Sequence, residues 1–328
     1  MSVGKRALVT GGAGFLGSHL CERLLAEGYE VVCLDNLLTG DAKNVLHLQA
    51  DDRFTFHKAD VTEPLNEDVT PDIIFHLASL ASPVHYSTYP IETLRVGSLG
   101  ADNVLELARR GGATVVFSST SEVYGDPEIN PQPESYWGNV NPVGPRSMYD
   151  EAKRYSEALA VAFYRHYGVD VRLARIFNTY GSRMRLDDGR VLPNFMVQAL
   201  TGKPLTVYGD GSQTRSLCFV DDLVEGLLRA AHWQSKLTKG QPQTGEPLIV
   251  NLGNPDEATV LQLAQEIIAV TGSDSTIDYK PLPGDDPQVR CPDITRAKKI
   301  LGWEPKVPRS EGLRRVVPYF KEALARGS

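Results

Sequence analysis

A phenol and an ammonium group stand four positions apart in the segment 149–153, at Tyr149 and Lys153. On a helix, this spacing places both side chains on one face. Because a nearby cation favours the phenolate, we expect Lys153 to lower the pKa of Tyr149 from its usual value of about 10. A tyrosine of that kind can act as a general base near neutral pH.

Two more reactive side chains follow a predicted buried strand at residues 113–119. The strand emerges at Thr120 and Glu122, and ligands of open parallel sheets bind outside the carboxyl ends of the strands. Thr120 could therefore hydrogen-bond the same substrate oxygen as Tyr149. Glu122 could serve as an acid or base, or it could simply cap a turn.

The elements that must position these groups begin with a glycine-rich turn after the apolar strand 6–9. Gly11 permits the tight turn, Gly14 lets the backbone approach a pyrophosphate, and Gly17 lets the following helix pack against the strand. The free amides and the positive end of that helix then face phosphate groups. This start predicts a dinucleotide site.

A second predicted strand, residues 30–34, ends at Asp35, about 20 residues after the glycines. An acid there can accept both hydroxyls of the adenosine ribose, and it repels a 2′-phosphate. No Arg or Lys follows directly, so the pattern favours NAD over NADP. The loop 36–40 could close over the adenosine, although Asp35 could also be a turn cap.

Strand and helix patterns alternate through the first half, which predicts an α/β fold with a Rossmann-type, doubly wound parallel sheet and a smaller C-terminal substrate-binding α/β part. We expect the NAD-binding domain at 1–179, with 217–252 returning to it, the substrate-binding part at 180–216 and 253–313, and a C-terminal helix at 314–328. The long Pro- and Gly-rich segment 124–147 is typical of a functional lid or a disordered loop. Tyr136 and Trp137 would help it to order against a ligand or a partner subunit.

Net charge, cysteine spacing and the length of the apolar runs limit the kinds of partner and compartment that we expect for this protein. The 328 residues carry a net charge of −7, which argues against nucleic acid as the main partner. The four cysteines have no metal-ligand or redox spacing, so we expect reduced packing residues in a cytoplasmic protein and no metal site. No apolar run approaches the roughly 20 residues that cross a bilayer, and the first strand leaves no room for a signal peptide.

Several longer segments carry a resemblance to a known family. They are 9–15, 76–79, 119–127, 141–146, 149–154, 174–181, 188–191, 205–209, 212–215 and 285–290. On these segments the chain resembles the extended short-chain dehydrogenase/reductases that act on nucleotide sugars, and among them the UDP-glucuronate decarboxylases. The resemblance implies a UDP-sugar substrate, tightly held NAD and a homodimer built on two long helices, here 91–110 and 149–166.

The resemblance also implies which residues form the site. Cofactor contacts are expected from Gly11, Gly14, Phe15, Leu16, Asp35, Asn36, Leu37, Thr39, Gly40, Asp60, Val61, Leu77, Ala78, Ser118, Tyr149, Lys153 and Arg183. Substrate contacts are expected from Ser79, Glu122, Asn178, Arg190, Tyr208, Gln213, Arg215 and Arg290. The catalytic set is Thr120, Glu122, Tyr149, Lys153 and Arg290. Arg183 could instead be solvated, and Arg290 could pair with Asp285 or Asp286 in its own loop.

The implied reaction is redox-neutral. Tyr149 removes the 4-hydroxyl proton of UDP-glucuronate during oxidation at C4, and the resulting β-keto carboxylate loses carbon dioxide. Thr120 and Tyr149 stabilise the enolate, and Arg290 orients the carboxylate or assists protonation. Protonation and return of hydride give UDP-xylose.

The rival functions are a 4-epimerase, a 4,6-dehydratase and a non-catalytic NAD-binding protein. A dehydratase of this fold typically has an Asp-Glu pair after the Thr, where this chain has Ser121, and an epimerase usually lacks the carboxylate of Glu122. Intact Thr120, Tyr149 and Lys153 argue against a non-catalytic protein. The chain departs from the family at Gly97, where Asn is usual, and at Leu80, where Pro is usual.

Overall fold

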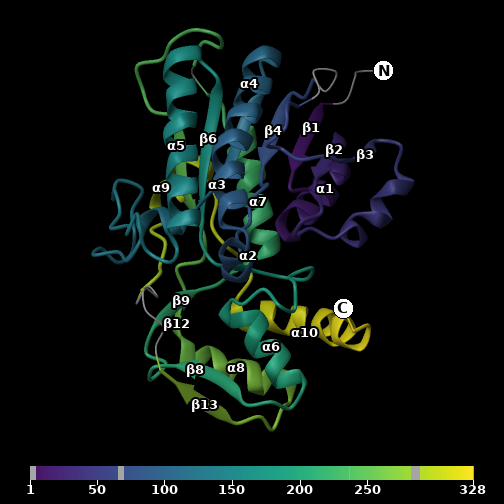
Figure 1. The fold of residues 1–328 in the computed structure, drawn as a ribbon, viewed down its shortest axis with the longest axis vertical. Coiled ribbons are helices and arrows are strands. Elements are labelled where there is room, and N and C mark those ends of the chain that lie inside the picture. Colours follow the sequence, from purple (N-terminus) through teal and green to yellow (C-terminus); the bar gives the residue numbers. More distant parts are fainter. Residues whose placement is uncertain (1–4, 66–69, 236, 282–288, 328) are drawn as a thin grey trace.

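Seven parallel strands form the central sheet of the computed structural model, which describes residues 5–65, 70–235, 237–281 and 289–327. Their order across the sheet is β11-β6-β5-β4-β1-β2-β3 (Figure 1). The strands are β1 (Arg6–Thr10), β2 (Glu30–Asp35), β3 (Phe54–Lys58), β4 (Ile73–His76), β5 (Thr114–Thr120), β6 (Asp170–Ile176) and β11 (Leu248–Leu252). The predicted fold class is confirmed: the chain order reverses between β1 and β4, as in a doubly wound sheet.

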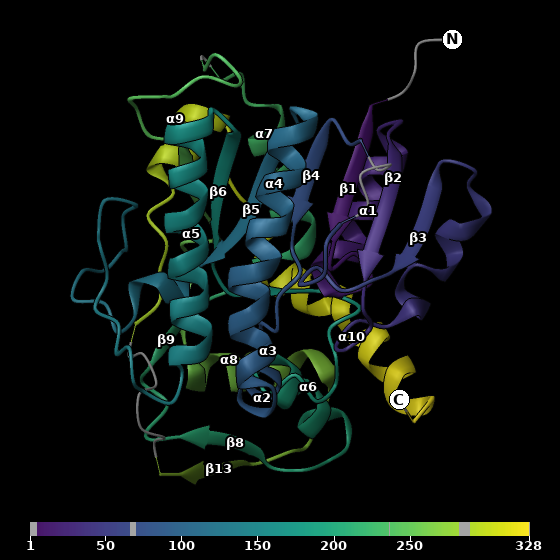
Figure 2. The ribbon, with the colours of Figure 1, turned by 45° about the horizontal axis from the view of Figure 1, so that its top comes forward.

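Helices cover both faces of the sheet, because its central strands are apolar on both sides. One face carries α1 (Phe15–Ala26) and α7 (Val220–His232), which pack on each other. The other face carries α3 (Pro90–Arg95), α4 (Ala101–Gly111) and α5 (Ser147–Tyr167); α3 and α4 follow each other in one column, which stands beside α5 in Figure 2. The helix that begins with Tyr149 in our prediction begins two residues earlier, at Ser147.

The predicted continuous helix 91–110 is interrupted. Between α3 and α4 the chain forms a π-helical turn, Val96–Gly100. Gly97 of this turn lies so close to α5 that an added Cβ would stand 2.6 Å from the Cβ of Ala152. The turn therefore brings the α3–α4 column against the part of α5 that lies between Tyr149 and Lys153.

The remaining elements gather at the carboxyl ends of the strands, in the lower part of Figure 1. They are α2 (Pro83–Thr88), β7 (Thr179–Tyr180), α6 (Val191–Leu200), β8 (Leu205–Tyr208), β9 (Thr214–Ser216), β10 (Cys218–Phe219), β12 (Glu257–Thr259), α8 (Val260–Thr271), β13 (Ile277–Lys280), α9 (Thr295–Leu301) and α10 (Arg309–Ala325). Of these, α9 packs higher up, against α7 and β11. The helix α10 packs on α6 and α8. The predicted division into domains stays a prediction.

Cysteine placement agrees with the sequence: Cys21, Cys33, Cys218 and Cys291 are all buried free thiols. Within the described ranges, no helix has the length and apolar content that a membrane crossing requires.

Candidate active site

A cavity of about 980 Å³ opens at the carboxyl ends of the strands, between the sheet and the lower elements. It is lined by the predicted catalytic residues, by every predicted substrate residue and by all but two of the predicted cofactor residues. The exceptions are Leu37, which packs against the hydrophobic core, and Asp60, which accepts a hydrogen bond from Asn36 at 2.9 Å. One cavity therefore brings together residues from nearly the whole length of the chain.

The glycine turn forms one wall of the cavity. Gly11 has a φ of +70°, and a Cβ there would lie 2.7 Å from the backbone nitrogen of Ala78. A Cβ on Gly17 would lie 2.7 Å from the Cα of Gly12. Gly17 thus allows the helix to approach the turn at the end of β1 closely, and α1 packs against β1.

Asp35 lies buried below the turn. Its carboxylate accepts the backbone N–H of Ala13 at 3.0 Å and that of Leu37 at 2.8 Å. A Cβ on Gly40 would lie 2.8 Å from an oxygen of Asp35. Burial raises the pKa of Asp35, and the two amides oppose that rise. The carboxylate is therefore fixed where the sequence predicts a ribose contact.

Arg183 shows that this wall fits a charged ligand. One guanidinium nitrogen pairs with Glu22 at 2.8 Å, while Nη1 is buried without a hydrogen-bond partner. A buried donor of this kind is costly unless an acceptor reaches it. The first turn of α1 also carries no acidic residue and no side-chain cap, so its amides remain available to phosphate. These features fit the pyrophosphate of NAD.

Tyr149 and Lys153 lie together on the opposite wall, yet their electrostatics differ from our prediction. The phenol is hydrogen-bonded to Thr120, and its ring centroid is 5.9 Å from the Lys153 Nζ. Lys153 donates to the backbone oxygen of Ser118 at 2.7 Å. Burial raises the pKa of Tyr149 above its ordinary value and lowers that of Lys153 to about 8. The expected lowering of the Tyr149 pKa is therefore wrong for the protein alone, because desolvation by burial is the largest influence on the phenol.

Glu122 is held between two guanidinium groups. Its Oε2 lies 2.6 Å from Arg146 Nη2 and 3.1 Å from Arg290 Nη2. Burial alone would raise the pKa of Glu122, but Arg290 and Arg146 hold it below the ordinary value. The turn after β5 is capped by the Thr120 side chain, so Glu122 is not the cap. Asp285 and Asp286, the alternative partners of Arg290, lie outside the described residues.

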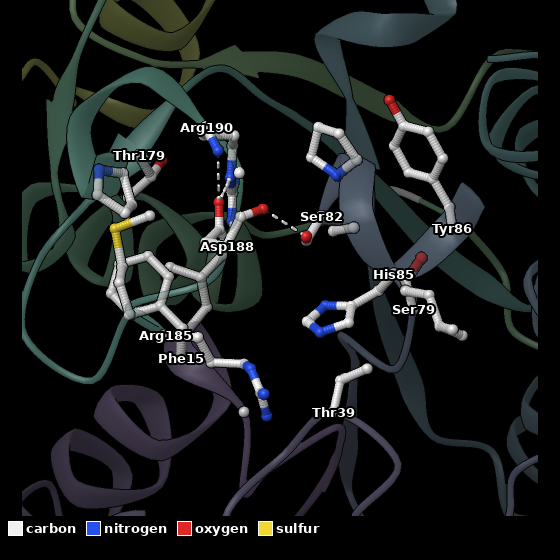
Figure 3. A pocket seen from close by; sticks show the side chains of 18 of the residues that line it. Phe15, Thr39, Ser79, Ser82, His85, Tyr86, Thr179, Arg185, Asp188 and Arg190 are labelled. Atoms are coloured by element: carbon white, nitrogen blue, oxygen red, sulfur yellow. Dashed lines mark hydrogen bonds and ion pairs between the residues drawn. The ribbon is translucent and has the colours of Figure 1, made fainter. Parts of the chain in front are cut away.

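The substrate side of the cavity is built from the loop before α6 and from the β8–β9 region. Arg190 is paired with Asp188 at 2.7 Å, and Ser82 donates to the backbone oxygen of Asp188 at 2.6 Å (Figure 3). Gln213 donates to the backbone oxygen of Tyr208 at 3.0 Å, while its Oε1 is buried without a partner. This free acceptor suits a ligand N–H.

Sequence analysis missed four residues beside the reacting groups. Tyr86 stacks on Tyr149 with ring centroids 5.3 Å apart, and His85 points into the cavity in Figure 3. Arg146 contacts Glu122, and buried Asp150 has one oxygen without a partner. Arg146 and Asp150 lie in segments that carried the resemblance, whereas Tyr86 reaches the site through tertiary packing.

Known proteins resemble this chain in sequence and in structure. A profile of the NAD dependent epimerase/dehydratase family matches residues 7–253. UDP-glucuronic acid decarboxylase 1 of Danio rerio is 51% identical over 320 residues, which cover 98% of this chain and 73% of that protein. UDP-glucuronic acid decarboxylase 2 of Arabidopsis thaliana is 51% identical over 321 residues, covering 98% and 69%.

Solved structures show the same fold. The UDP-glucose 4-epimerase of Thermotoga maritima, solved with UDP-glucose, is 31% identical with a TM-score of 0.85, covering 97% of this chain and 99% of that one. The UDP-glucuronic acid 4-epimerase of Bacillus cereus, in complex with UDP-glucuronic acid and NAD, is 26% identical with a TM-score of 0.84 and the same coverage.

Among the described residues, no group of three or more His, Cys, Asp or Glu side chains could hold a metal ion.

Proposed function

The chain belongs to the NAD dependent epimerase/dehydratase family, and from this premise we propose that it converts UDP-glucuronate to UDP-xylose and carbon dioxide. The observation that carries the proposal is the placement of Glu122 between Arg146 and Arg290, next to the Thr120–Tyr149 pair. Two guanidinium groups around one carboxylate leave net positive charge. That charge suits a second carboxylate, the one on the sugar.

When bound, NAD supplies the acceptor that oxidises C4 of the sugar and returns the hydride at the end of the cycle. Arg183, Asp35 and the amides of the glycine turn would hold it. Lys153 would hold a ribose hydroxyl of the nicotinamide half, since it already lies beside Tyr149.

Tyr149 takes the proton of the 4-hydroxyl as C4 is oxidised. Thr120 shares that oxygen from the sheet side, because it is hydrogen-bonded to the phenol. Burial holds the Tyr149 pKa high in the protein alone. Ionisation of the phenol therefore requires positive charge near it, which Lys153 supplies and to which bound NAD would add.

Arg290 acts next. Once C4 is a ketone, the carboxylate on C5 is β to it, so the C5–C6 bond breaks, carbon dioxide leaves, and the electron pair moves onto the C4 oxygen. Arg290 orients the carboxylate, and Thr120 and Tyr149 stabilise the enolate oxygen. Because arginine contacts keep the pKa of Glu122 low, this carboxylate is a poor proton donor. We assign it to the orientation of Arg290 and Arg146.

A defined reaction mixture tests the proposal. Purified protein is incubated with UDP-glucuronate and NAD, while carbon dioxide and nucleotide sugars are followed. UDP-xylose without net NADH is the expected result. Stoichiometric NADH with a UDP-4-keto pentose would mean that hydride is not returned. No reaction with UDP-glucuronate, together with turnover of UDP-glucose or UDP-galactose, would assign the protein to the epimerases.

We also propose a cytoplasmic homodimer. The cysteines are reduced and buried, which is usual in that compartment. Three apolar side chains of the α3 region are exposed at the helical spacing of one stripe: Ile91 at 54%, Leu94 at 39% and Leu99 at 52%. Tyr155 on neighbouring α5 is exposed at 52%. A second copy of this chain would cover this face.

A further inference from the structure

One buried amide side chain ties the segment of Arg290 to the long loop 125–146. Gln132 of this loop is 0% exposed. The side-chain Oε1 of Gln132 accepts the backbone N–H of Cys291 at 2.9 Å, and the backbone N–H of Gln132 donates to the backbone oxygen of Cys291 at 2.9 Å. Its backbone oxygen accepts the N–H of Asp293 at 3.0 Å. Gln132 therefore holds both polar backbone groups of the residue next to Arg290.

The other end of the Gln132 side-chain amide also makes hydrogen bonds. Its Nε2 donates to the backbone oxygen of Ile129 at 2.8 Å and to Asn130 Oδ1 at 3.1 Å. The N–H of Cys291 requires an acceptor and the oxygen of Ile129 requires a donor, so only one orientation of the amide satisfies both. Among the common side chains, this combination of acceptor, donor and length is specific to glutamine.

Arg290 is held from its other side by Ser216. The Ser216 hydroxyl donates to the backbone oxygen of Arg290 at 2.9 Å. The Arg290 side chain, itself 2% exposed, then reaches the end of β5, where Nη1 donates to the Ser121 oxygen and Nη2 pairs with Glu122. The direction of this side chain thus depends on backbone contacts from Gln132 and Ser216.

We propose that Gln132, together with Ser216, is a positioning residue for Arg290, and that the loop 125–146 is part of the scaffold that orients the sugar carboxylate. This inference rests on the proposed decarboxylation. The predicted substrate residues Asn178, Arg190 and Tyr208 lie on other elements and contact neither Gln132 nor Cys291 through any hydrogen bond that the structure shows. Loss of the amide should therefore slow the loss of carbon dioxide while UDP still binds.

A double-mutant cycle tests the inference. Gln132→Leu keeps the size of the side chain and removes its hydrogen bonds; we expect kcat for carbon dioxide release to fall about tenfold or more, since small misplacements of a reacting group are costly. The dissociation constant for UDP should stay within about twofold. In an Arg290→Ala background the same change should lower kcat by less than about twofold, because the group that it positions is already absent.

Two further variants keep the test decisive. Asn139→Ala removes an exposed amide of the same loop, whose side chain donates only to the Asp126 oxygen, and should leave kcat unchanged. If Gln132→Leu does not fold, Ser216→Ala deletes the contact on the other side of Arg290 and should show the same non-additivity with Arg290→Ala.

The outcomes separate the two proposals. Two results would overturn the positioning role. One is a kcat for Gln132→Leu equal to that of the wild type. The other is a fall in kcat on Gln132→Leu that is as large in the Arg290→Ala background as in the wild type. Wild-type protein that binds UDP and NAD but releases no carbon dioxide from UDP-glucuronate would instead contradict the proposed function.

Discussion

Tyr149 experiences opposing influences in the cavity. Burial raises the pKa of its phenol, and the hydrogen bond from Thr120 lowers it. Stacking on Tyr86 holds the ring in place. The side chain is therefore positioned before it is chemically activated, and its hydroxyl can be removed without disturbing the packing.

We expect Tyr149→Phe to lower kcat for UDP-xylose formation by about 10²- to 10⁴-fold, the usual contribution of a general base. Binding of NAD and UDP, measured by calorimetric titration, should change little, because the ring and its stacking remain. Tyr167→Phe removes a hydroxyl from an exposed tyrosine at the far end of the same helix and serves as the control. Undiminished turnover in Tyr149→Phe would remove Tyr149 from its assigned role.

Asp150 makes stability depend on pH. Burial, followed by the charge of Glu122, raises the pKa of this carboxyl from 3.8 to about 7. The folded state therefore holds the proton more tightly than the unfolded state does, and the associated stability is lost as the pH rises from about 4 to about 7. One pKa unit corresponds to about 1.4 kcal/mol, so the upper bound of this loss is about 4 kcal/mol.

Asp150→Asn should remove that loss. The thermal midpoint of the variant should therefore rise relative to that of the wild type as the pH increases from about 4 to about 7, with little difference below about pH 4. Glu151→Gln is the matched control, because this side chain is 37% exposed and pairs with Arg154 only at 3.8 Å. A pH-independent difference between Asp150→Asn and wild type would contradict the assignment.

At the scale of elements, the π-helical turn determines how closely the α3–α4 column approaches α5. The Ser156 hydroxyl donates to the Gly97 oxygen at 2.6 Å, and a Cβ on Gly97 would lie 2.9 Å from the Ala152 oxygen. A larger side chain at this position would require another local geometry. Here glycine is matched to Ala152, which lies on α5 between Tyr149 and Lys153.

Gly97→Asn should push α5 outward, destabilising the fold by about 1–3 kcal/mol, as overpacking usually does. Because α5 carries Tyr149 and Lys153, kcat should fall as well, and circular dichroism melting with an activity assay measures both. Gly111→Ala in the same α4 column is the control, since nothing lies within 4 Å of its added Cβ. If Gly97→Asn melts and turns over like the wild type, close packing at this turn is not required.

At the scale of the whole molecule, most of the central sheet could be predicted from the sequence. Its central strands contain buried apolar runs, and the glycine turn and Asp35 have fixed places in such a unit. The strand β11 lies in the segment 217–252, which we expected to return to the first domain, and it joins the sheet beside β6. The π-helical turn could not be predicted, because helical periodicity continues through it and only contact with Ala152 explains it.

The residues of the site could be predicted from the sequence where they lie in recognisable motifs. The end of a predicted strand led to Thr120 and Glu122, and the resemblance led to Arg290; the structure brings all three together. Electrostatics were not predictable in the same way: spacing alone suggested that Lys153 would lower the pKa of Tyr149, whereas the depth of burial decides it. The anchoring of Arg290 by Gln132 joins positions 158 residues apart, which no local pattern reveals.

The last prediction concerns the exposed apolar side chains of α3 and the turn that follows it, because a monomer seldom leaves a contiguous apolar patch uncovered. If a second copy covers Ile91, Leu94 and Leu99, a carboxylate placed there must be desolvated on association, at a cost of several kcal/mol per unpaired ion. Ile91→Asp with Leu99→Asp should therefore shift the protein from dimer to monomer in analytical ultracentrifugation. Leu46→Asp, on a residue that is 60% exposed beside the opposite edge of the sheet, should leave the mass unchanged. A wild-type monomer, or a double variant that stays dimeric, would mean that this face is not the interface.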